Sequence, residues 1–130
     1  MVYKLNEIID DINKQNYENE PINITNFLHF FCLKHKKFVI NEQNDAQEFL
    51  RVILDDLNQE LNEISKKPLF YELPDEQYRS KFNPAKDFRK NFISREKSIV
   101  TDYFYSQFIN TVTCKCGKLS YGFEIIIDIP

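Results

Sequence analysis

The N-terminal half of the chain carries apolar residues at spacings of three and four, the repeat of a helix with one buried face. Three such segments follow one another, at 5–12, 24–35 and 44–64, and Asn23 or Thr25 is the expected N-cap of the second. The third segment has the longest stripe, which consists of Ala46, Phe49, Leu50, Ile53, Leu54, Leu57, Leu61 and Ile64. We therefore predict three helices, the last of about five turns.

A cluster of polar residues stands at the start of the third segment, in NEQNDAQEF. Asn44 followed three residues later by Gln47 has the spacing of a capping box. Asp45 and Glu48 lie in the first turn, where the helix dipole favours negative charge. The same two carboxylates are spaced i, i+3 beside Gln43, and this arrangement suits a clamp for an extended basic peptide. Capping and clamping both remain open from the residues alone.

The pattern changes in the C-terminal half to a polar, proline-punctuated stretch and then to β-type sequence. Asn83-Pro84 has the form of an N-cap followed by proline at the first helical position, which predicts a short helix near 84–95. Alternating apolar residues from Phe123 to Ile129 predict a strand. Both glycines lie in CKCGKLSYG, just before this strand, and predict a hairpin or a knuckle. The expected class is α+β, with helices first and an antiparallel β hairpin after them.

Composition narrows the class of protein. The 130 residues suffice for one modest domain, and 42% of them are hydrophobic, so the chain is able to bury a core. The net charge is −3 without a basic patch, which argues against nucleic acid as a partner. No apolar run approaches the roughly 20 residues of a membrane span, and the N-terminus lacks a signal-peptide core. We expect an intracellular protein, cytoplasmic or nuclear, with no membrane partner.

The three cysteines could serve as metal ligands or as nucleophiles. Cys114 and Cys116 are weak candidates for zinc, because their C-x-C spacing is one residue shorter than the usual C-x₂-C and no second pair follows. A hairpin with two free thiols is the alternative, and we expect no cofactor. Cys32 has His35 three residues on, but without an evident orienting partner for either side chain we expect a structural role.

Two stretches resemble one family. QNDAQEFLRVILDDLNQEL, residues 43–61, resembles the glutamine–aspartate box of the ubiquitin-specific proteases, which commonly reads Q-Q-D-A-x-E-F-L and continues into a helix. Residues 98–130 are similar to a later segment of that family, with a Ser-Ile…Asp-x-Phe run, a strand, a Cys-x-x-Cys-Gly knuckle, Phe-Glu and a second strand. The two stretches follow the order of the family, with a variable insertion between them.

This resemblance implies a fold and a division of the chain. The family consists of cysteine isopeptidases that cut after the C-terminal glycine of ubiquitin, and its papain-like fold is described as thumb, palm and fingers. Residues 1–64 would be the helical thumb-like region, 65–97 a variable connecting segment with a short helix, and 98–130 the β fingers with the knuckle. All three would belong to one partial catalytic domain.

The resemblance also implies roles for residues of the box. Asp45 matches the acidic contact to the extended C-terminal tail of ubiquitin, which carries arginines. Gln43 and Glu48 match neighbouring positions that line the same channel, and Ala46 and Phe49 match packing positions. The expected partner is therefore ubiquitin or a ubiquitinated protein. In the knuckle, the second cysteine is displaced by one residue from the family pattern.

The catalytic residues of the family have no counterpart in this sequence. Its nucleophile lies in a Gly-x-x-Asn-x-Cys-Tyr-x-Asn box, which does not occur in the 130 residues, and its His segment would follow Pro130. We expect the parent protein to be a thiol-dependent hydrolase whose remaining catalytic domain completes the triad, and this chain alone to be an inactive fragment. The alternative is a non-catalytic ubiquitin- or protein-binding module from a relative that lost the triad.

Overall fold

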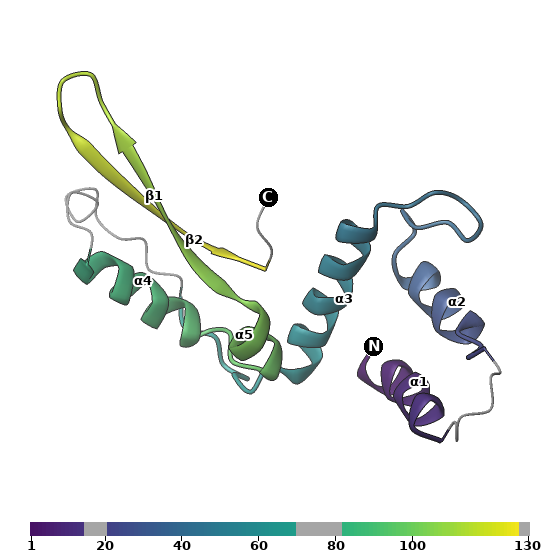
Figure 1. The fold of residues 1–130 in the computed structure, drawn as a ribbon. Helices are drawn as coiled ribbons and strands as arrows, with labels where there is room; N and C mark the ends of the chain where they lie inside the picture. The colour runs from purple at the N-terminus through teal and green to yellow at the C-terminus, as the bar shows by residue number, and fades with distance from the viewer. Residues whose placement is uncertain (15–20, 70–81, 128–130) are drawn as a thin grey trace. The chain divides into compact units, whose positions relative to one another are not determined.

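The computed structural model describes residues 1–14, 21–69 and 82–127. Contacts divide the chain into two compact units, Met1–Glu60 and Leu61–Pro130. In the described residues, five helices precede a two-stranded antiparallel sheet (Figure 1), which confirms the α+β class. Among these helices, none is long and apolar enough to cross a membrane. The division into thumb-like, connecting and finger regions stays a prediction.

The first unit is built from three helices around an aromatic core. They are α1 (Val2–Lys14), α2 (Thr25–Lys34) and α3 (Ala46–Leu61), so each predicted helix is present. The Phe31 side chain is fully buried, and its ring centroid lies 4.6 Å from that of Phe49 and 5.0 Å from that of Phe38. Aromatic pairs at such distances add to the burial of apolar area. The packing therefore ties α2 to the first turn of α3.

The ends of α2 and α3 differ from the prediction because side chains compete with the helix for backbone N–H groups. Ile24 holds the N-cap position of α2, where the prediction of Asn23 or Thr25 is wrong; the Asn23 Oδ1 atom accepts the N–H of Thr25 at 2.9 Å instead. Helix α3 ends at Leu61 rather than near 64. The Oδ1 atom of Asn62 accepts the N–H of Ile64 at 3.0 Å, which turns the chain away from the helix.

In the second unit, α4 (Phe82–Ile93) lies along one face of the hairpin. The helix starts before Asn83, so the prediction of a cap at that residue is wrong, but Pro84 still falls in the first turn, where a missing N–H costs nothing. Phe88 packs against Phe123 with ring centroids 5.9 Å apart, and the Gln107 amide donates to the backbone oxygen of Ala85 at 2.9 Å. Figure 1 shows the hairpin extending beside this helix.

A short helix that the sequence reading missed, α5 (Ile99–Phe104), leads into the hairpin. The Ser98 side chain is buried and accepts the N–H groups of Val100 and Thr101, while the Thr101 hydroxyl accepts the N–H of Ser98. This is a capping box with threonine in the place of glutamate. The frequent β-branched residues from Ile99 onward concealed it.

The hairpin consists of β1 (Ser106–Thr113) and β2 (Leu119–Ile126), with Thr113 opposite Leu119. The predicted alternation is confirmed from Phe123 to Ile125, but Ile126 is half-buried like Ile125. The strand begins earlier than predicted and ends at Ile126, so its predicted extension to Ile127 is wrong, because the chain bends there. Residues 128 and 129 of the predicted strand lie outside the described residues. Five residues, 114–118, connect the strands, so the predicted hairpin is confirmed.

Candidate functional site

The polar cluster seen in the sequence surrounds the N-terminus of α3. The helix begins at Ala46, and the Oδ1 atom of Asp45 accepts the backbone N–H of Glu48 at 3.0 Å. An acceptor directly before the first helical residue that binds the third N–H is an N-cap. The predicted capping box of Asn44 and Gln47 is therefore wrong by one residue: Asp45 is the cap.

Asn44 has a different task, which the sequence reading missed. Its Nδ2 atom donates to the backbone oxygens of Val39 and Glu42, both at 3.0 Å, and its Oδ1 atom accepts the N–H of Val39 at 3.4 Å. Inside this loop Asn41 has φ of +68°, a left-handed conformation that asparagine tolerates better than most residues. Asn44 thus fixes the conformation of the loop that leads into Asp45.

The three residues assigned to ligand binding are all exposed at this end of α3. They are Gln43, in the loop, Asp45, at the cap, and Glu48, in the first turn. The Oε1 atom of Glu48 pairs with Nζ of Lys37 at 2.7 Å, an exposed ion pair that the sequence reading did not foresee. Asp45 and Glu48 therefore share one end of a helix, but part of the Glu48 charge is already balanced.

Phe49 anchors this end of the helix in the core. It is half-buried, between Phe31 and Phe38, and its ring centroid lies 5.9 Å from that of Phe38. The expected packing role is confirmed for Phe49. It is wrong for Ala46 in this structure, because that residue is exposed.

An apolar hollow of about 210 Å³ borders the loop and the first turn of α3. Cys32, which is half-buried, lies in its wall and packs against the core, in agreement with a structural role. The wall consists of Leu28, Phe31, Cys32, Phe38, Val39, Ile40, Asn41, Glu42, Asn44 and Phe49. Half of the loop that precedes Asp45 thus faces an apolar depression.

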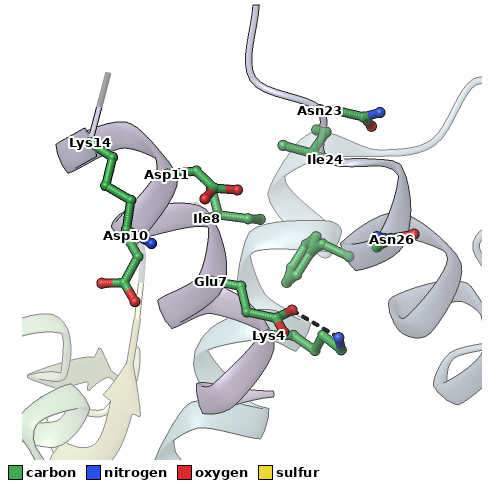
Figure 2. A pocket seen from close by; sticks show the side chains of 10 residues that line it. Lys4, Glu7, Ile8, Asp10, Asp11, Lys14, Asn23, Ile24 and Asn26 are labelled. Atoms are coloured by element: carbon green, nitrogen blue, oxygen red, sulfur yellow. Dashed lines mark hydrogen bonds and ion pairs between the residues drawn. The ribbon is translucent and has the colours of Figure 1, made fainter. Parts of the chain in front are cut away.

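A second hollow of about 330 Å³ lies in the same unit, between α1 and the start of α2 (Figure 2). Its rim carries both signs of charge, and Lys4 donates to Glu7 at 2.8 Å along the helix. Asp10, Asp11 and Asn23 stand at its margin. None of the residues assigned to ligand binding lines it. None of them lines the first hollow either, but their chain neighbours Asn44 and Phe49 do, so the first hollow is the one next to the predicted site.

A buried carboxylate, Asp56, joins α2 to α3. Its Oδ2 atom lies 2.7 Å from Nε2 of His35 and its Oδ1 atom 2.9 Å from Nζ of Lys34. Burial acts to raise the pKa of Asp56, but the hydrogen bonds from His35 and Lys34 outweigh it and hold this pKa below its ordinary value. The signal in the sequence was an aspartate seven residues after Phe49, on the apolar face of α3. It gives His35 the partner that the sequence reading did not find.

Cys114 and Cys116 lie in the second unit, in the turn of the hairpin, where both are exposed and free. A structural zinc site needs four ligands. Across residues 1–14, 21–69 and 82–127, no group of three or more Cys, His, Asp or Glu is placed to hold a metal ion. The described residues therefore supply at most two zinc ligands and do not fit a closed site. The expectation of no cofactor stays a prediction.

A model of one protein family matches residues 1–119, and its description is ubiquitin carboxyl-terminal hydrolase. Ubiquitin carboxyl-terminal hydrolase 32 of Homo sapiens is 38% identical over 84 residues, which cover 64% of this chain and 5% of that protein. Ubiquitin carboxyl-terminal hydrolase 15 of Xenopus tropicalis is 38% identical over 84 residues, which cover 64% of this chain and 8% of that protein. For ubiquitin carboxyl-terminal hydrolase 4 of Pongo abelii the identity is 37% over 84 residues, which cover 64% of this chain and 9% of that protein. The matched part is less than a tenth of each relative.

Proposed function

Because the chain belongs to the ubiquitin carboxyl-terminal hydrolase family, we propose that it forms the thumb-like part and the start of the fingers in a deubiquitinating cysteine protease. In this proposal the N-terminal end of α3 binds the C-terminal tail of ubiquitin. The nucleophilic cysteine and its histidine come from sequence other than these 130 residues, in which the nucleophile box of the ubiquitin-specific proteases does not occur. The whole protein then hydrolyses the isopeptide by thiolate attack.

The position of Asp45 is the observation that carries the proposal. One lone pair of its carboxylate is used by the N–H of Glu48, and an ionised carboxylate has about four acceptor sites. That single backbone bond fixes the orientation of the side chain while leaving acceptor capacity toward solvent. A guanidinium group of the tail would therefore meet a carboxylate that is already oriented, which lowers the entropy lost on binding.

Glu48 and Gln43 assist, and Glu48 does so less than its charge suggests. An exposed ion pair such as the one between Glu48 and Lys37 contributes only about 0.2–1 kcal/mol, so an arriving arginine can compete for the carboxylate. Lys37 at the same time repels a basic tail that approaches from its side. We expect Asp45 to account for most of the electrostatic attraction.

The apolar hollow beside the loop explains how one extended segment can use both features. Successive side chains of an extended peptide point to opposite sides. A basic side chain directed to Asp45 would place its neighbours away from the carboxylate, toward surfaces such as the hollow that Asn44 borders. The site therefore suits an extended peptide with alternating basic and apolar side chains.

The test compares ubiquitin with ubiquitin that lacks its C-terminal tail, using the complete catalytic domain. Asp45→Asn keeps a capping side chain but removes the charge, and Asp11→Asn removes an exposed carboxylate elsewhere in the same unit. We expect Asp45→Asn to weaken binding of intact ubiquitin roughly three- to tenfold, the loss of one charged contact. Binding of tailless ubiquitin should not change, and Asp11→Asn should affect neither. Equal weakening of both ligands by Asp45→Asn would refute the assignment.

A further inference from the structure

The turn of the hairpin holds two thiols in a defined backbone geometry. The N–H of Cys114 donates to the backbone oxygen of Lys118 at 2.8 Å, and the N–H of Gly117 donates to the backbone oxygen of Cys114 at 2.9 Å. Gly117 has φ of +81°, a left-handed conformation that glycine adopts without strain in a tight turn. The turn therefore fixes the backbone at Cys114 and at Cys116, two residues later.

Both thiols are exposed in this turn, two residues apart in the chain. The backbone N–H of Cys116 and then its thiol lower the pKa of Cys114, and Lys115 and Lys118 add positive charge to the same turn. An exposed, electropositive setting of this kind is typical of reactive cysteines.

We propose that Cys114 and Cys116 form a reversible disulfide, so that the tip of the hairpin is a thiol redox site. Cα atoms two residues apart in a turn are roughly 5.5 Å from each other, inside the range of about 4.4–6.8 Å that disulfides require. Both cysteines lie in the turn, outside the paired residues of the two strands. Closing the bond therefore needs side-chain rotation rather than a rearrangement of the strands.

The reaction requires a two-electron oxidant, for which we name hydrogen peroxide. The thiolate of Cys114 attacks one peroxide oxygen, the O–O bond breaks, and the hydroxide that leaves takes a proton to form water. The sulfenic acid at Cys114 is then attacked by the Cys116 sulfur; an S–S bond forms, the S–O bond breaks, and the thiol proton leaves with hydroxide as a second water. Two thiols and one peroxide thus give one disulfide and two waters.

The bond should be easy to reduce. A disulfide that closes so short a loop departs from relaxed geometry, and strained, exposed disulfides have the higher reduction potentials of labile bonds. A dithiol reductant would therefore restore both thiols. Reversibility separates this site from a structural disulfide.

Peptide mapping of the full-length protein tests the proposal. The protein is reduced, freed of reductant, treated with hydrogen peroxide in steps up to a small molar excess, alkylated and digested with trypsin. Cleavage after Lys115 separates Cys114 from Cys116, so a disulfide keeps the two peptides joined, with the loss of two hydrogen atoms. We expect this linked product to form first, while Cys32 remains alkylatable, and to disappear after addition of dithiothreitol.

Three variants complete the test. Cys116→Ser should stop at a sulfenic acid on Cys114 that a 1,3-diketone traps, whereas Cys114→Ser should slow oxidation of Cys116 several-fold. Cys32→Ser, the matched control outside the turn, should leave the linked product unchanged. The proposal fails if Cys32 is oxidised before the pair, if the turn cysteines advance to sulfinic acid without linking, or if they link only between molecules.

Discussion

The backbone N–H of Glu48 donates to the Oδ1 atom of Asp45 at 3.0 Å, so the residue proposed to bind ubiquitin also caps the helix that carries it. The same carboxylate thus has a structural and a functional role. The structural role needs an acceptor oxygen and the functional role needs a negative charge. A substitution that removes the negative charge but keeps an acceptor oxygen separates the two roles.

The capping role predicts different effects for two substitutions of Asp45. Asp45→Ala removes the acceptor and should lower the free energy of unfolding by about 0.5–2 kcal/mol, the usual loss of an N-cap. Asp45→Asn keeps an acceptor and should change it by less than about 0.5 kcal/mol. Urea unfolding measures both, with Asp11→Ala as the control. A large loss for Asp45→Asn together with unchanged ubiquitin turnover would leave capping as the only role.

The hydrogen bonds of Asn44 predict that the loop contributes both to the stability of the fold and to ubiquitin binding. Asn44→Ala removes the side-chain bonds to Val39 and Glu42, and at a net value of about 0.5–1.5 kcal/mol each, reduced by exposure, the expected loss is about 1–2 kcal/mol. Because the loop positions Gln43 and Asp45, ubiquitin binding by the complete domain should also weaken. Asn26→Ala, an exposed asparagine on α2, should alter neither quantity. Unfolding curves and binding titrations of both variants decide the matter.

The buried carboxylate of Asp56 predicts a larger effect on stability. Asp56→Ala leaves His35 and Lys34 without their shared acceptor and should lower the free energy of unfolding by about 2–4 kcal/mol. This loss is smaller than that of a fully buried pair because Lys34 is partly exposed. Asp10→Ala, on the surface of α1, should cost less than about 0.5 kcal/mol. Thermal and urea unfolding of the two variants test this difference. Equal losses would show that the contact contributes nothing.

The lowered pKa of Asp56 gives that contribution a pH dependence. A group whose pKa is lower in the folded state than its ordinary value of 3.8 binds a proton more readily when unfolded. Its contribution is therefore complete above this value and is lost as the pH falls through the lower folded pKa. The difference between the wild type and Asp56→Asn should therefore shrink as the pH falls below 3.8. A difference that does not change in this acidic range would contradict the assignment.

The absence of the nucleophile box from the sequence predicts that the purified 130-residue chain does not cleave ubiquitin amides. A fluorogenic amide at the C-terminus of ubiquitin is the substrate to use, with the complete domain as the positive control. Turnover by the chain above the level of buffer would contradict the prediction. If the complete protein is also inactive, the non-catalytic binding module replaces the protease as the function.

The sequence by itself determined the helices of the first unit, the hairpin and the family, because these rest on periodicity and on local motifs. The stripe from Phe49 to Leu57 required a helix whatever it packs against, and Gly117 in CKCG required a turn. Element ends were less certain, since Asn23, Asp45 and Asn62 each have several backbone groups within reach and the sequence does not say which one they bind. Helix α5 was hidden by β-branched residues that only the Ser98 cap overrides.

Tertiary structure decided the contacts between residues far apart in the chain. Lys37 meets Glu48, and His35 meets Asp56, because α2 and α3 pack through Phe31 and Phe49. No local pattern encodes which cation pairs with which carboxylate, since pairing depends on the separation and rotation of two helices once their apolar faces are buried. That packing left Asp45 exposed at the start of α3 while it balanced part of the charge of Glu48, and so it distinguished two carboxylates that the sequence had presented as a pair.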